Sequence, residues 1–253
     1  MSEHLVITGT SGAIGGAIAR ALRRRHPTAR LTLVDVTEAP SRALIELVGG
    51  EVELAPCDLA DPAAALRTLD QARGRFGPVS GLVNCAGFME VRRFDQIPWT
   101  RAAELLAVDL ISPLGLMRAV VDDMTAARRG FIVNVASMAA KVTLPGCAFY
   151  GAAKAGLSMA SEIARRELAP LGIHVLTVYP GAVASPLEAR ARDQYGRTLL
   201  TRLVPTGDPD VLADKVIDGL DARRARIVYP SLYSLGLLSI ASPIALAFGP
   251  TAN

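Results

Sequence analysis

Short apolar runs rich in β-branched residues alternate along this chain with longer segments rich in alanine, leucine and arginine. The runs at 5–8 and 131–137 are nearly continuous in apolar residues, as expected of strands buried on both faces. Because such strands alternate with helical segments, the sequence predicts an α/β fold, a doubly wound parallel sheet flanked by helices. We expect strands at 5–8, 31–36, 52–56, 81–87, 131–137, 174–181 and 226–230, and helices near 13–25, 42–48, 61–75, 99–128, 149–169 and 208–220.

The length of 253 residues and an apolar fraction of 51% predict a single domain with a substantial core. We expect this domain to span residues 1–230 and to be followed by an apolar C-terminal segment at 231–253. The net charge of +3 is small and the basic pairs are scattered, which argues against a nucleic-acid-binding surface.

The three cysteines, Cys57, Cys85 and Cys147, are odd in number and lack the spacing of metal ligands. They predict neither a disulfide framework nor a metal site, and they fit a reducing cytoplasm. The N-terminal MSEH runs directly into an apolar strand, so we expect no secretory signal.

The first predicted strand runs into TGTSGAIGG at 8–16, a glycine-rich turn that opens a helix. Glycines at 9, 12 and 15 allow a tight turn and a close approach to a pyrophosphate, which the free N–H groups of a helix N-terminus would bind. Because the turn joins the first strand to the first helix, it favours a Rossmann-like dinucleotide-binding fold over an ordinary tight turn.

Asp35 ends the second predicted strand, twenty residues after Gly15. A carboxylate there would accept hydrogen bonds from the ribose hydroxyls of an adenosine and repel a 2′-phosphate. No arginine or lysine lies in the glycine turn or directly after Asp35. These observations favour NAD over NADP, the alternative being that Asp35 only caps a strand end.

Six motifs follow one another in order over residues 5–186. They are TGTSGAIG at 8–15, CDL at 57–59, NCAG at 84–87, Ser137, the pair Tyr150 and Lys154, and YPGAV at 179–183. In this order they resemble the short-chain dehydrogenase/reductase family. The resemblance implies an NAD(P)-dependent oxidoreductase that interconverts a secondary alcohol and a ketone, and a homodimer or homotetramer.

The resemblance also implies which residues bind the cofactor. They are Gly9, Ser11, Gly12, Ile14, Gly15, Asp35, Asp58, Leu59, Asn84, Ala86, Gly87, Tyr150, Lys154, Val183 and Ser185. Residues of the glycine turn would line the phosphates and the nicotinamide ribose. Asp58 and Leu59 would meet the adenine, and the residues at 183 and 185 would hold the nicotinamide carboxamide.

Tyr150 and Lys154 are four residues apart, so on a helix their side chains share a face. The ammonium and a positive nicotinamide ring would favour the phenolate and lower the pKa of Tyr150 from about 10. In this interpretation Tyr150 takes the alcohol proton in oxidation and returns it in reduction, while Ser137 stabilises the substrate oxygen. Lys154 would also bind the nicotinamide ribose.

Two positions depart from the family's usual pattern. The turn has Gly12 and Ala13 where a small residue followed by glycine is commoner, a spacing more typical of the epimerase-like branch. Asp109 replaces the asparagine that shapes a helix and supports a water near the lysine. We count Asp109 among the candidate catalytic residues because its charge would act on the proton relay.

Substrate choice is expected to lie at 184–205, where several leucines could form an apolar pocket with a lid. The stretch 232–248 is nearly continuous in apolar and small residues, but Gly236 and Pro243 interrupt it. A lid or dimer contact, a monotopic membrane contact and a membrane span stay open for it. The first two favour an apolar or lipid-like substrate and a cytoplasmic protein that can associate with a membrane.

Two other functions also stay open. A non-catalytic redox sensor would bind the dinucleotide but would not require Tyr150. An epimerase or dehydratase is suggested by the position of Gly12, yet only about 70 residues follow PGAV, too few for the substrate domain usual in that branch.

Overall fold

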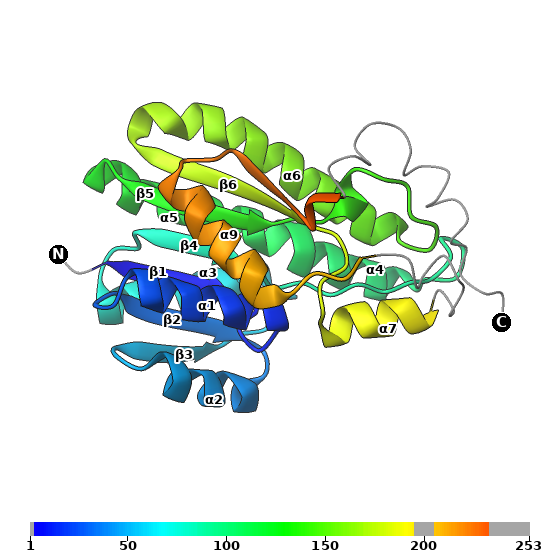
Figure 1. The fold of residues 1–253 in the computed structure, drawn as a ribbon, viewed down its shortest axis with the longest axis horizontal. Helices are drawn as coiled ribbons and strands as arrows, with labels where there is room; N and C mark the ends of the chain where they lie inside the picture. The colour runs from blue at the N-terminus through cyan, green and yellow to red at the C-terminus, as the bar shows by residue number, and fades with distance from the viewer. Residues whose placement is uncertain (1–2, 195–204, 233–253) are drawn as a thin grey trace.

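The computed structural model describes residues 3–194 and 205–232. Within them, seven parallel strands form one sheet in the order β3-β2-β1-β4-β5-β6-β7 (Figure 1). The strands are β1 (His4–Thr8), β2 (Arg30–Asp35), β3 (Val52–Pro56), β4 (Gly81–Asn84), β5 (Gly130–Val135), β6 (Ile173–Pro180) and β7 (Arg226–Tyr229). The chain winds outward from β1 to β3, then crosses back to β4 and continues to β7, which confirms the predicted doubly wound sheet.

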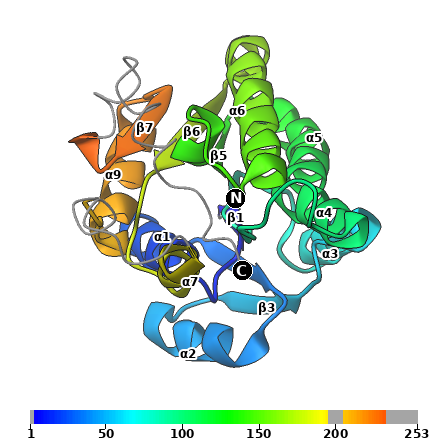
Figure 2. The same ribbon diagram turned by 90° about the vertical axis from the view of Figure 1, so that its right-hand side faces the viewer.

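Helices cover both faces of this sheet (Figure 2). One layer contains α1 (Ala13–Arg25), α2 (Glu38–Val48) and α9 (Pro209–Asp221), and the other contains α3 (Pro62–Phe76), α5 (Ser112–Ala127) and α6 (Ala148–Leu168). A cluster of buried apolar side chains fills each interface, so the strands are apolar on both faces.

Two shorter helices lie beyond the carboxyl ends of the strands, α4 (Trp99–Leu106) and α7 (Pro186–Gln194), at the right of Figure 1. The sequence analysis predicted no helix at α7. Among the helices of the described residues, none has the length and apolar character to cross a bilayer. The predicted boundary at 230 is not tested, and most of the apolar segment 231–253 lies outside the described residues.

The helical region predicted at 99–128 is present, and a π-helical segment, Ala107–Ile111, interrupts its α-helical hydrogen bonding between α4 and α5. Pro113 contributes to this break because it has no N–H to donate to the carbonyl of Asp109, four residues earlier. The π-helical turn places Asp109 in the interior of the molecule, where it is 0% exposed. Such segments occur frequently at functional sites.

Strand β4 ends at Asn84, three residues earlier than predicted. The chain leaves the sheet there because the Thr8 hydroxyl accepts hydrogen bonds from the next two backbone N–H groups, those of Cys85 and Ala86, both at 3.1 Å. The sequence analysis assigned no role to Thr8. Its hydroxyl ties the segment after β4 to the end of β1, beside the glycine turn.

The glycine turn is packed against backbone at two points. Gly9 has a φ of +74°, and a Cβ there would lie 2.6 Å from the Cα of Ala86. A Cβ at Gly15 would lie 2.1 Å from the carbonyl oxygen of Gly9. Only glycine therefore lets the turn close upon itself and upon the end of β4.

We expect Gly15→Ala to lower the free energy of unfolding by about 1–3 kcal/mol, because its methyl group would overlap backbone that cannot move aside. The matched control is Gly74→Ala in α3, where a Cβ would meet nothing within 4 Å. The control should be more stable than the parent by about 0.5–1 kcal/mol. Urea unfolding of both variants measures the difference, and equal stabilities would contradict the observed packing of the turn.

Candidate active site

Three of the predicted catalytic side chains come together at the carboxyl ends of the central strands. Ser137 follows β5, and Tyr150 and Lys154 lie in the first two turns of α6. Tyr150 is 8% exposed and Lys154 is 4% exposed. The Lys154 Nζ lies 5.8 Å from the centre of the Tyr150 ring, and the Ser137 hydroxyl is close enough to the phenol to lower its pKa. The i, i+4 spacing therefore places both groups in one buried site.

Asp109 completes this group from the π-helical segment. Its Oδ1 lies 2.8 Å from the Lys154 Nζ, and its Oδ2 accepts a hydrogen bond from the Phe88 N–H at 3.2 Å. The Lys154 ammonium also donates to the carbonyl of Val135 at 3.2 Å. A Cβ at Gly87 would lie 2.3 Å from the carboxylate, so glycine is needed beside this ion pair.

Burial and the neighbouring charge act in opposite directions on each member of the pair. Burial raises the pKa of Asp109, and the Lys154 ammonium opposes that rise. Burial works against the charge of Lys154, but the Asp109 carboxylate together with Tyr150 and Cys85 outweighs it, and the pKa of Lys154 is raised. The lysine thus stays an ammonium in the interior of the protein.

The predicted lowering of the Tyr150 pKa assumed a bound, positively charged nicotinamide ring, and in the protein by itself the contributions together raise this pKa. Burial raises the pKa of Tyr150, and the charges of Asp109 and Cys147 add to that rise. The Lys154 ammonium and the Ser137 hydroxyl act in the lowering direction without outweighing it. The sequence could not show how completely the phenol is buried, or that an anion lies against its lysine.

The glycine turn presents the N-terminus of α1 at the same edge of the sheet. Gly12 is the N-cap residue, and within the described chain no side chain caps this helix. Its first N–H groups are therefore available to a phosphate. Asp35 lies beside the turn, where its Oδ2 accepts a hydrogen bond from the Ser11 N–H at 2.8 Å and its Oδ1 accepts one from the Thr37 N–H at 3.0 Å.

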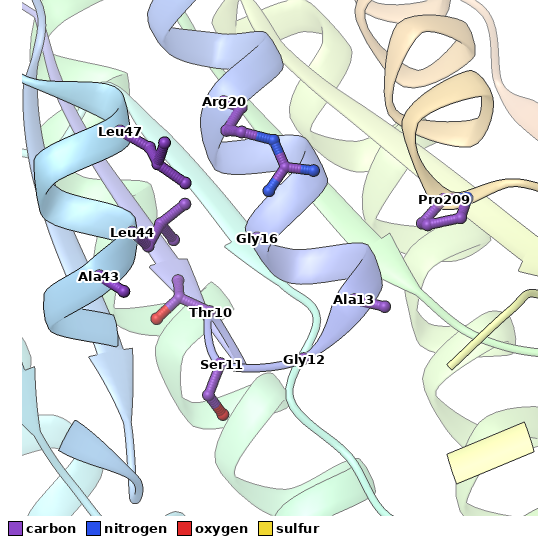
Figure 3. A pocket seen from close by; sticks show the side chains of 10 residues that line it. All are labelled: Thr10, Ser11, Gly12, Ala13, Gly16, Arg20, Ala43, Leu44, Leu47 and Pro209. Atoms are coloured by element: carbon purple, nitrogen blue, oxygen red, sulfur yellow. The ribbon is translucent and has the colours of Figure 1, made fainter. Parts of the chain in front are cut away.

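A pocket opens between α1 and α2 next to this turn (Figure 3). Thr10, Ser11 and Gly12 lie at one end, and Leu44 and Leu47 form its apolar wall. Arg20 is the cation among its lining residues, and its guanidinium donates to Asp210 of α9 at 2.6 Å.

The predicted adenine-contacting residues follow β3. Asp58 is exposed, and its carboxylate accepts a hydrogen bond from the Ala60 N–H at 2.9 Å. Leu59 is buried in the core layer, and its carbonyl accepts a hydrogen bond from the Ser112 hydroxyl at 2.7 Å. The Asp58 side chain is therefore exposed to solvent, whereas the Leu59 side chain is in the core.

Asn84 lies at the end of β4, as predicted, and its role in lining the cofactor stays a prediction. Its side-chain amide lies within the protein and donates to Asn134 Oδ1 at 2.9 Å and to the Pro113 carbonyl at 3.3 Å. It therefore joins β4 to β5 and to α5. Ala86 and Gly87, which follow it, are the parts of the motif beside the glycine turn and the ion pair.

The segment after β6 brings Val183 and Ser185 to the carboxyl end of the sheet. Val183 is buried and forms a parallel bridge with Gly207. The Ser185 hydroxyl accepts a hydrogen bond from the Glu188 N–H at 3.1 Å and caps α7. The rest of the predicted substrate segment, 195–204, lies outside the described residues.

These residues fit a nicotinamide dinucleotide. The uncapped N-terminus of α1 suits a pyrophosphate, and Asp35 suits a ribose. The Tyr150 and Lys154 pair lies at the same carboxyl edge of the sheet as the glycine turn. Within the described residues, no group of three histidines, cysteines or acids could hold a metal ion.

Comparisons with known proteins agree with this geometry. The family model for short chain dehydrogenases matches residues 3–196. D-threitol dehydrogenase of Mycolicibacterium smegmatis is 32% identical over 214 residues, 82% of this chain and 82% of that protein. The 3-hydroxyacyl-CoA dehydrogenase type-2 of Bos taurus is 31% identical over 223 residues, 82% of this chain and 85% of that protein.

A solved structure extends the comparison to almost the whole chain. The short-chain dehydrogenase from Sphingobium yanoikuyae in complex with NADPH is 26% identical and has a TM-score of 0.79, covering 99% of this chain and 98% of that one. Together with the family match and the arrangement of Ser137, Tyr150 and Lys154, these likenesses establish that the chain belongs to the short-chain dehydrogenase/reductase family.

Proposed function

We propose that this protein is an NAD-dependent oxidoreductase that interconverts a secondary alcohol and a ketone on an apolar substrate. The observation that carries the proposal is the buried group of Ser137, Tyr150 and Lys154 beside a glycine turn that leads into an uncapped helix. The two relatives compared above are both named dehydrogenases. A bound nicotinamide dinucleotide would supply or accept the hydride.

The chain's own residues handle the proton and the substrate oxygen. The Tyr150 Oη donates its proton to the oxygen of a ketone, or takes the proton of an alcohol in the reverse direction. The Ser137 hydroxyl, which lies beside that phenol, holds the same oxygen as its charge changes. The Lys154 ammonium is available to the ribose hydroxyls, and the ion pair with Asp109 fixes its position.

We expect Tyr150→Phe to lower kcat by at least about 100-fold, because it removes the proton that is transferred but not the ring that fills the site. Dinucleotide affinity, measured by calorimetry, should change little. Tyr229→Phe is the matched control, since Tyr229 lies outside the site and its hydroxyl accepts a hydrogen bond from the Asp208 N–H. An unchanged kcat in Tyr150→Phe would contradict proton transfer by Tyr150, whereas a parent protein that binds the dinucleotide but turns over no alcohol or ketone would favour the redox-sensor alternative.

The preference for NAD rests on the surroundings of Asp35. Its carboxylate lies within hydrogen-bond distance of the turn, where a 2′-phosphate would bring a second negative charge. The nearby Arg20 is paired with Asp210 and is not free to balance that charge. The compared Sphingobium structure contains NADPH, so the preference is a property to be tested in this chain.

We expect Asp35→Asn to shift the NAD-to-NADP ratio of kcat/KM toward NADP by about tenfold, equivalent to about 1.4 kcal/mol. Asparagine keeps an oxygen for the Ser11 N–H while it removes the repulsive charge. Steady-state kinetics with both cofactors measure the ratio. A parent protein that already prefers NADP would disprove the assignment.

The apolar substrate is supported by the side chains around Tyr150. Val91, Leu105 and Cys147 are buried in one cluster with the phenol ring, and partly buried residues pack against this cluster. Those residues include Phe88, Met89, Leu144 and Phe149. A substrate that packed against the exposed parts of these partly buried side chains would gain binding energy in proportion to the apolar area it buries.

Across a homologous series of methyl ketones, we expect kcat/KM to rise with chain length by up to about fourfold per methylene, since each buried CH₂ is worth about 0.8 kcal/mol. The rise should stop once the cleft is filled. Small hydroxyketones of equal length serve as polar controls. Better turnover of those controls would contradict an apolar cleft.

We also propose a homodimer or homotetramer. Three apolar side chains, Ile111, Met159 and Ile163, are exposed on the π-helical segment and on α6. A subunit contact would cover them. A cytoplasmic location and a peripheral membrane contact through 231–253 stay predictions.

A further inference from the structure

The carboxylate at position 109 gives this site a charge that asparagine would not. Asp109 is fully buried and contacts the one ammonium in the site at 2.8 Å. Its Oδ2 accepts a hydrogen bond from the Phe88 N–H, and its Oδ1 forms an ion pair with the Lys154 Nζ without the alignment of a hydrogen bond. Two donors and no acceptor suit an ionised carboxylate, since a protonated one would have to donate on one side.

The charges in the site therefore balance before Tyr150 loses a proton. Lys154 carries one positive charge and Asp109 one negative charge, and the phenol is neutral. Ionisation of Tyr150 would leave a net negative charge in an interior where Tyr150, Lys154 and Asp109 are almost fully excluded from solvent. Such a charge is costly in a medium of low dielectric constant.

The other groups around the phenol do not change this balance. From its own helix and the loop before it, Tyr150 faces Lys154 and the thiol of Cys147. Asp109 faces it from the π-helical segment, and Ser137 from the end of β5. Cys85, at the end of β4, faces Lys154, and burial raises the pKa of this thiol to about 12, so it is neutral at ordinary pH.

We propose that Asp109 is a positioning residue whose charge balances that of Lys154 and thereby keeps Tyr150 protonated in the protein by itself, ready to donate its proton. This inference rests on the proposed function for its role in catalysis, but the protonation of Tyr150 can be tested without any substrate. Tyr150 becomes a base only when another positive charge enters the site, and an oxidised nicotinamide ring carries one. For ketone reduction, the phenol of Tyr150 is then already protonated, as a proton donor must be, up to alkaline pH.

The test is a titration of the protein without cofactor, followed by the ultraviolet absorbance of tyrosinate. Subtraction of the Tyr150→Phe curve isolates Tyr150 from the other tyrosines. We expect its midpoint to lie above the usual value of about 10. In Asp109→Asn it should fall by at least about one unit, because Lys154 is then uncompensated. Asp122→Asn, which removes an exposed carboxylate on α5, should leave the midpoint unchanged.

A midpoint below the usual value in the parent protein would overturn the proposal, and that measurement does not require Asp109→Asn to fold. An unchanged or higher midpoint in a folded Asp109→Asn would overturn it as well. In ketone reduction, the alkaline limb of the kcat profile should move to lower pH in Asp109→Asn by the same interval as the phenol. If the phenol titrates as expected but no alcohol or ketone is turned over, the proposed function fails and this inference holds.

Discussion

The ion pair between Lys154 and Asp109 is the contact on which the arrangement of the site depends. Burying two charges is costly, and their attraction repays this cost only when the geometry is close and the remaining polar atoms are satisfied. Here the carboxylate also accepts from the Phe88 N–H and the ammonium also donates to the Val135 carbonyl. The pair thereby joins the π-helical segment, α6, β5 and the chain after β4 around one point.

The segments around the ion pair can meet because the strands of the sheet are parallel. All seven strands of the described chain run in the same direction, so the segments that follow their carboxyl ends gather along one edge. The glycine turn after β1, the segment after β4 and Ser137 after β5 are neighbours for that reason. The order of strands places β1 next to β4, and glycines at 9 and 87 let the backbones and the ion pair approach closely.

In our proposal, the balance of charge between Lys154 and Asp109 favours the protonated form of Tyr150, which is the form that ketone reduction requires. A lysine alone would pull the phenol toward ionisation, but the same lysine held against a carboxylate has less influence on it. The fixed dipoles and charges of the site are set before any substrate enters, as electrostatic catalysis requires. In this proposal the carboxylate of Asp109 acts on the protonation of Tyr150, while Ser137, Tyr150 and Lys154 remain the catalytic groups.

Much of this could be read from the sequence, because the responsible signals are local. The apolar strands, the glycine turn and the i, i+4 spacing of Tyr150 and Lys154 each depend on neighbouring residues, so they predicted the sheet, the dinucleotide edge and the pairing of the two side chains. The helical region predicted at 99–128 is present, but its π-helical turn could not be predicted because such a turn has no periodicity of its own. Strand β4 is shorter than predicted because a distant hydroxyl, that of Thr8, takes over its hydrogen bonds.

The sequence by itself determined which chemical groups the site contains and in which order along the chain they come. Only the tertiary structure decided the protonation states of these groups, because their burial and the distances between their charges depend on segments far apart in the sequence. Tyr150 illustrates this: its residue type and spacing predicted a lowered pKa, and its burial together with Asp109, 41 positions away, raises it. The physical reason is that a pKa depends on the surroundings in space, which the fold alone assembles.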